Sequence, residues 1–365
     1  MPVYLLRLFL IPFALISLPG LSMKDQYISR PIQPILPKEA KEEPGKQPAL
    51  DINGQGRVGL TYGFGDSILY TGSCDGGITF SASQLVAELA DLALGMGRGP
   101  QITSANDFTV VTATTQSGDV FAYRLDHARQ KWSPAIRIND VDTIAKEGFS
   151  AVASYQNTVL AVWLDMRDNQ KNKVYGAWSK DGGKSWGKNV LVYESPEGTI
   201  CECCKVTAIA DSKGNFYVMF RNNLKGSRDL HLISSLHGKS FGKAQKLGLG
   251  TWPLQACPMD GGDLSINQEG KPVTVWRRRS ELFKARPGEA EQLLGEGKTP
   301  SIGQGSSGAY VVWQRDGEIM LTTPLLPQAR SLGKGAYPKI RVLRNENAAV
   351  CVWEQEGKIK IQRVD

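Results

Sequence analysis

A turn motif that recurs at a nearly fixed interval constrains this chain more than any other feature. The pattern Ser-x-Asp-x-Gly-x-Thr/Ser-aromatic is complete at residues 73–80 and 179–186, and a degenerate copy without the Asp lies at 234–241. Its closing aromatics are 52, 54 and 55 residues apart, at Phe80, Trp132, Trp186 and Phe241. A period of this length indicates a stacked or radial array of similar units.

The chemistry of the motif explains its spacing. An Asp side chain accepts hydrogen bonds from backbone amides two residues on, Gly supplies a positive φ, and the aromatic anchors the turn on the next sheet. Such a turn joins two antiparallel strands. We therefore assign Asp75 and Asp181 a structural role and not a catalytic one.

A second signature predicts the number of units. Short β-branched segments end in an apolar residue followed by an aromatic, and they are bounded by Gly, Asn or Asp, as strands are. They occur at 162–163, 219–220, 275–276, 312–313 and 352–353, with weaker copies at 61–62 and 110–114. Only 83–94 has sustained helical periodicity. The pattern predicts an all-β fold, a β-propeller with seven blades, or with six if the weak early units merge.

Three regions are expected along the chain. Residues 1–22 combine an early Arg, an apolar run and small residues, as in a signal peptide, so we expect an exported protein, periplasmic or secreted, without stable membrane insertion after cleavage. Residues 23–49 form a proline- and charge-rich arm, of which 28–36 is expected to add the missing outer strand of the last blade. Residues 50–365 form the propeller.

Propeller topology also predicts where a site lies. The Asp turns occupy one face, so the segments leading into the innermost strands, and the loops after the second strands, converge on the other face around the central channel. Guanidinium groups there are suited to carboxylates, which they bind bidentately. Alternatively they pair with local acids. The candidate ligand-binding residues are Arg98, Arg167, Arg221, Arg277 and Arg278.

The Asp turns, the β-strand units and the inward arginines resemble the sialidase-like superfamily of Asp-box (BNR) propellers. The resemblance covers most of residues 50–255 and implies a glycoside hydrolase in which a Tyr activated by Glu is the nucleophile and an Asp is the acid–base. By this resemblance Tyr337, Glu202 and Asp165 would take these roles. Many non-catalytic propellers share the turns, so a propeller acting as an interaction scaffold or as a thiolate metal-binding protein is the alternative.

The cysteines are the other distinctive feature. Cys201, Cys203, Cys204 and Cys257 precede the inner strands of adjacent units, whereas Cys74 and Cys351 stand alone. In an oxidising compartment, disulfides between neighbouring blades are expected. Along a strand, side chains 201 and 203 would share one side and 204 would face the other. The alternative is a thiolate site for Cu(I) or Zn(II).

The charge and residue composition limit the classes of ligand and cofactor that we expect. The net charge is +7, with basic residues scattered through the chain, which favours an acidic glycan or another small anion over nucleic acid. The three histidines do not cluster, so a histidine metal site or a Ser-His-Asp triad is not predicted. No Gly-rich phosphate loop precedes a helix, and we expect no organic cofactor.

Overall fold

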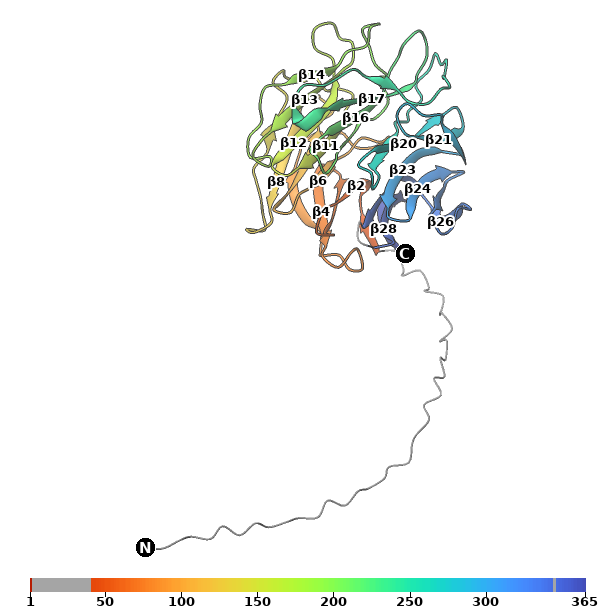
Figure 1. The fold of residues 1–365 in the computed structure, drawn as a ribbon. Coiled ribbons are helices and arrows are strands. Elements are labelled where there is room, and N and C mark those ends of the chain that lie inside the picture. The colour runs from red at the N-terminus through yellow and green to blue at the C-terminus, as the bar shows by residue number, and fades with distance from the viewer. Residues whose placement is uncertain (2–40, 344–345) are drawn as a thin grey trace, which may run out of the picture. The chain divides into compact units, whose positions relative to one another are not determined.

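The computed structural model describes Met1 and residues 41–343 and 346–365, and the last two ranges form an all-β unit. Its strands make seven sheets that follow one another around an axis, with β2 beside β28 where the ring closes (Figure 1). The seven-bladed propeller is thereby confirmed, and the six-bladed alternative is wrong. No helix in the described part combines the length and hydropathy needed to cross a bilayer. The expected signal segment, 1–22, lies outside the described residues except for Met1.

Each blade begins at the axis and runs outward through antiparallel strands. The innermost strands are β2 (Lys46–Ile52), β6 (Gln101–Ser104), β11 (Ser150–Tyr155), β15 (Thr207–Ala210), β19 (Asp263–Ile266), β23 (Lys298–Gly305) and β27 (Ala336–Leu343). The second strands are β3 (Val58–Phe64), β7 (Phe108–Thr114), β12 (Thr158–Asp165), β16 (Phe216–Arg221), β20 (Pro272–Arg278), β24 (Gly308–Arg315) and β28 (Ala348–Gln355).

The outer half of each blade is more exposed. The third strands are β4 (Ser67–Ser73), β8 (Val120–Asp126), β13 (Lys173–Ser179), β17 (Leu230–Ser235), β21 (Glu281–Ala285), β25 (Glu318–Thr322) and β29 (Lys358–Val364). The outer strands are β5 (Gln84–Glu88), β9 (Lys131–Trp132), β10 (Ile136–Arg137), β14 (Val190–Tyr193), β18 (Gln245–Lys246), β22 (Gln292–Glu296), β26 (Arg330–Lys334) and β1 (Lys41–Pro44). A 3-10 turn, η1, spans Leu236–Gly238.

The N-terminal side of the chain completes the last blade. Strand β1 pairs antiparallel with β29, with Lys41 opposite Ile361 and Pro44 opposite Lys358. A proline is tolerated there because β1 is an edge strand and needs no second partner. The segment expected to take this position, 28–36, lies outside the described residues. Among the described residues, strands β1 and β2 belong to the blades although they begin before residue 50.

The aromatic signature marks the second strand of every blade except β7, and in several blades the aromatic packs against the segment leading into the innermost strand. A Cβ added to Gly297 would lie 2.4 Å from Trp313, and one added to Gly335 would lie 2.2 Å from Trp353. Gly45 meets Tyr62 in the same way. These second strands are almost fully buried, and their side chains form apolar clusters between neighbouring blades.

The Asp turns hold blades together. The backbone amides of Lys184 and Ser185, three and four residues on, donate to Asp181 Oδ1 at 3.0 and 2.9 Å. The Ser185 hydroxyl donates to Asp181 Oδ2 at 2.5 Å. Gly183 has a φ of 86° and packs on Val110 of the preceding blade, where a Cβ would approach to 2.7 Å. The turn at Asp75 repeats these bonds.

Replacing Asp181 by Asn is expected to lower the free energy of unfolding at pH 7 by about 1–2 kcal/mol, because the turn amides lose a charged acceptor. Burial raises the pKa of Asp181, but the bonds from Ser185 and its neighbours outweigh it and lower the pKa to about 2. Its stabilising contribution is therefore present above the ordinary carboxyl pKa and is lost as pH falls toward 2. Urea unfolding of the unaltered protein and of Asp181→Asn, at pH 7 and near pH 2, measures the difference in the free energy of unfolding.

Asp66 is the matched control, an exposed turn Asp whose side chain makes no hydrogen bond within residues 41–343 and 346–365. Asp66→Asn is expected to leave unfolding unchanged within about 0.5 kcal/mol. Equal effects of the two substitutions would contradict the role of the Asp181 turn.

Candidate functional site

Two cavities meet on the propeller axis. On the face opposite the Asp turns is a small one of about 40 Å³, which we call the mouth. Every blade contributes to it from the start of its innermost strand or from the segment just before that strand. One contributor from each blade, in chain order, is Gln47, Gly97, Phe149, Cys203, Met259, Thr299 and Tyr337.

The larger space, which we call the channel cavity, has a volume of about 610 Å³. It is bounded by the inner strands and extends to the turns after them, such as Asn53–Gly54 and Tyr155–Asn157. These turns lie on the same face as the Asp turns, because Ile52 and Ser73 both lie opposite Val58. The larger cavity therefore lies on the Asp-turn face, whereas the topology predicted a site on the opposite face.

A cluster of charges lies where the two cavities meet. Lys205 and Lys339 border both cavities, and Arg341 borders the channel cavity. Lys339 lies close enough to Lys205 for the charge of Lys205 to act on it. Neither lysine forms an ion pair with a carboxylate in the part of the chain that the structure describes. Burial and then the charge of Lys205 lower the pKa of Lys339 well below its ordinary value.

Two carboxylates share this cavity in different environments. Asp263 Oδ2 accepts bonds from Ser301 Oγ at 2.5 Å and Arg341 Nη1 at 3.1 Å, and Oδ1 accepts the Leu264 amide. Burial raises the pKa of Asp263, but Arg341, Lys205 and Lys339 outweigh it and hold the pKa below the ordinary value. Burial raises the pKa of Asp51, although the Ser104 amide donates to Oδ2 at 2.8 Å.

The predicted arginines lie on the expected face, but each of them has a bonding partner within the protein. Arg221 is 1% exposed. Its guanidinium donates to the carbonyls of Asp260, Arg228 and Arg277, at 3.1, 2.6 and 3.0 Å respectively. Arg221 is therefore a structural residue that ties two blades together.

The other arginines do not form a ring around a ligand either. Arg167 bonds Asp165 and Asp140, and Arg278 pairs with Glu291 at 2.6 Å. Arg277 pairs with Asp260 at 3.7 Å. Arg98 donates to the Glu147 carbonyl and stacks on Phe149, which lines the mouth. The structure thus follows the alternative in which arginines pair locally.

The residues assigned by resemblance to catalysis are not brought together. Asp165 is fully buried, bonded by Trp163 Nε1 at 2.8 Å and by Arg167. Glu202 pairs with Arg228 at 3.3 Å. Tyr337 lines the mouth, and burial raises the pKa of its phenol, which disfavours the phenolate that a nucleophile requires.

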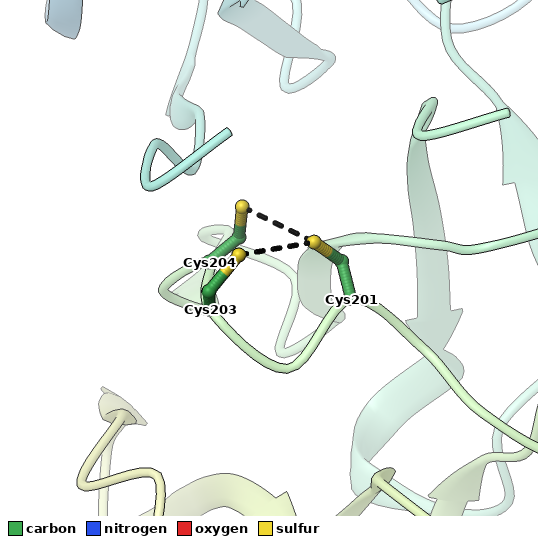
Figure 2. A group of neighbouring side chains, drawn as sticks. All are labelled: Cys201, Cys203 and Cys204. Carbon is green, nitrogen blue, oxygen red and sulfur yellow. Dashed lines mark hydrogen bonds between the residues drawn. The ribbon is translucent and has the colours of Figure 1, made fainter. Parts of the chain in front are cut away.

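Three cysteines form a buried cluster beside the mouth. Cys201 Sγ lies 3.6 Å from Cys203 Sγ and 3.5 Å from Cys204 Sγ (Figure 2). These separations exceed a disulfide bond of about 2.05 Å, and none of the six cysteines is paired. The expected inter-blade disulfide is therefore absent from the structure. Cys257 is exposed, and its hydrogen bond with Cys203 raises the pKa of its thiol to about 11.

The expectation that Cys204 faces away from Cys201 and Cys203 is wrong. Residues 202–204 form a turn before β15 and not a strand, so alternation does not apply. The Cys201 amide donates to the Arg221 carbonyl at 2.9 Å, which fixes the start of the turn. Hydrogen bonds from Cys203 and Cys204 lower the pKa of Cys201 to about 3, whereas burial raises that of Cys204.

Sequence reasoning missed the lysines and Arg341. Lys339 and Arg341 alternate along β27, so both side chains face the axis. That alternation of basic residues in an otherwise apolar inner strand is the signal that would have found them. Lys205 carries no such signal, because it lies in the segment before β15.

Replacing Arg221 by Met is expected to lower the free energy of unfolding by about 3 kcal/mol or more, because three buried carbonyls lose their donor. Urea unfolding followed by tryptophan fluorescence measures the change. Arg137→Met is the control, since its pair with Asp142 is 42% exposed on the Arg side and such pairs contribute little. A loss below 1 kcal/mol at Arg221 would contradict the structural assignment.

No protein-family model matches the chain, and no curated protein matches it. Among solved structures, the BP39L lectin from Burkholderia pseudomallei aligns with a TM-score of 0.64 at 12% identity, over 88% of this chain and 96% of that one. The alignment is nearly complete on both sides, so it concerns the whole propeller.

Two carbohydrate-active enzymes align similarly. The α-L-arabinanase of Penicillium chrysogenum, solved with arabinobiose, has a TM-score of 0.56 at 12% identity, covering 90% of this chain and 98% of that one. A PL25 ulvan lyase bound to GlcA(1-4)Rha3S has a TM-score of 0.55 at 10% identity, covering 88% and 94%. At such identities the likeness shows the fold alone. The chain has the β-propeller architecture that its resemblance to the sialidase-like superfamily implied.

Proposed function

We propose that this propeller binds an acidic sugar in the channel cavity, with the carboxylate held by Lys205, Lys339 and Arg341. The observation that carries the proposal is that Lys205, Lys339 and Arg341 all line one cavity of about 610 Å³. That volume is within the usual range for small-molecule sites, about 300–1,000 Å³.

The electrostatics explain why an anion would bind there. Two ammonium groups side by side repel each other, so without an anion one of them is favoured in the neutral form. Arg341 also lies in the cavity, and its partner Asp263 already accepts bonds through both oxygens. A carboxylate placed between the lysines would restore both charges and accept charge-assisted hydrogen bonds.

The rim of the channel cavity offers groups suited to a sugar. Tyr155 is partly exposed, and Asn106, Gln156 and Asn157 are exposed beside it. An aromatic face packs against the C–H face of a pyranose, while amide groups both donate to and accept from hydroxyls. The cavity thus combines an anion site at its floor with a polar, aromatic rim.

The comparisons support a glycan as the ligand class. The similar solved structures include a lectin, a protein bound to arabinobiose and one bound to a glucuronate-containing fragment. We infer binding without sialidase cleavage, because Tyr337, Glu202 and Asp165 are separately engaged. We also propose an exported protein, on the basis of the apolar segment within 1–22.

Isothermal titration with a glucuronate-containing disaccharide and with its neutral glucose counterpart tests the proposal. The acidic sugar is expected to bind at least tenfold more tightly. Lys339→Gln and Lys205→Gln are each expected to reduce that preference to less than threefold, because the carboxylate loses a charged donor. Lys131→Gln, on outer strand β9, is the matched control and keeps the preference.

Equal affinity for the two sugars in the unaltered protein would refute the proposal. Chromatography of the same mixtures after prolonged incubation reports cleavage, and any product that requires Tyr337 would overturn the inference of binding alone.

Binding of the acidic sugar is expected to weaken as pH rises and to take up a proton. In the free protein burial and the charge of Lys205 lower the pKa of Lys339, and a bound anion would favour its charged form. Titration in two buffers of different ionisation enthalpy measures proton uptake. Uptake is expected to disappear in Lys339→Gln, and its persistence there would assign the proton to another group.

A further inference from the structure

The strongest unassigned feature is the sulfur cluster beside the mouth. Cys201, Cys203 and Cys204 are 1%, 7% and 2% exposed, and their three Sγ atoms all lie within 4.8 Å of one another. Figure 2 shows the three sulfurs pointing toward one another from a single turn. No other group of this kind occurs in the described ranges, 41–343 and 346–365.

The turn itself creates the cluster. Ile200 bridges to Asn222, and the Cys201 amide donates to the Arg221 carbonyl, so the turn begins from a fixed point. Arg221 in turn donates to the carbonyl of Asp260 in the next blade. The sulfurs are therefore held by a backbone anchored on two blades, which is the preorganisation that a metal site needs.

We propose that Cys201, Cys203 and Cys204 form a three-coordinate thiolate site for Cu(I). Soft thiolate ligands select Cu(I) and Zn(II) among biological cations. A zinc ion completes a tetrahedron with bonds of about 2.3 Å, and within the described chain the group that converges contains three sulfurs. The exposed Cys257 stands outside it. Three converging sulfurs fit a three-coordinate monovalent ion.

Charge around the cluster supports the same ion. Three thiolates and one Cu(I) carry a net charge of −2. Arg228 and Arg221 lie close enough to Cys201 to influence it electrostatically. The Nε of Arg228 is buried without a hydrogen-bond partner in the described chain. An N–H beside Cys201 is suited to donate to a metal-bound sulfur, as outer-shell groups of metal sites do.

The mouth gives the ion a route to the cluster. Cys203 lines the mouth together with Met259, which is 44% exposed. Cys257, also exposed, lies near Cys203. The sulfur atoms of Met259, Cys257 and Cys203 therefore lie between the solvent and the rest of the buried cluster. Binding exchanges thiol protons for the ion, the protons passing to solvent, and the ion is supplied as Cu(I), so no oxidant or reductant is consumed.

The test titrates the full chain with Cu(I) alone, anaerobically, against a chromogenic Cu(I) chelator. One equivalent is expected to be retained in competition with the chelator. Cys201→Ser is expected to weaken retention at least a hundredfold, because two coordinating sulfurs remain. Cys74→Ser, at an exposed cysteine remote from the cluster, is the matched control and should retain one equivalent. Near-ultraviolet circular dichroism verifies that each variant is folded.

Three outcomes would overturn the assignment. These are failure of the unaltered protein to retain Cu(I), retention unchanged in folded Cys201→Ser, and tighter binding of Zn(II) that depends on Cys257. Peptide mapping of the protein as isolated adds a fourth, a disulfide within 201–204. Because the lysine variants leave the sulfurs intact, failure of the sugar experiment is distinguishable from failure of this one.

Discussion

Ring closure by β1 and β29 is the interaction on which the rest of the structure depends. Each blade leaves one edge to solvent and packs its faces on its neighbours, so only a closed ring lets every apolar face find a partner. The pairing of Lys41–Pro44 with Lys358–Ile361 joins the two ends of the described chain within one sheet. The closing blades then share a core that contains Leu60 and Val350.

Closure also gives the two ends of the axis different chemistry. One end is built from the segments before the innermost strands. These segments pack tightly against the signature aromatics and leave a cavity of only about 40 Å³. The other end is built from the turns after the inner strands, which spread apart and leave about 610 Å³. Lys205 and Lys339 stand at the boundary. The Asp-turn face therefore has space for a sugar-sized ligand, whereas the mouth does not.

The sequence was sufficient for features that depend on local periodicity. The seven signature segments, from Tyr62 to Trp353, each lie in the second strand of a separate blade. The segment in β7 does so without an aromatic residue. Strand β5, however, lies within 83–94, where the pattern is helical, because pairing with β4 overrides the local pattern. The roles of the arginines depend on long-range partners, such as the carbonyl of Asp260 for Arg221. Spacing alone does not report such partners.

The segment from Cys201 to Lys205 belongs to both candidate sites. Its first residues hold the sulfur cluster, and its last borders the channel cavity, with Cys203 and Lys205 lining the same mouth. The cluster with Cu(I) carries negative charge, whereas the lysine pair carries positive charge. Charges so close in a partly enclosed space interact strongly. Under the two proposals, occupation of the sulfur site would favour the protonated lysines and compete with a sugar carboxylate for them, which would couple the two ligands through one turn.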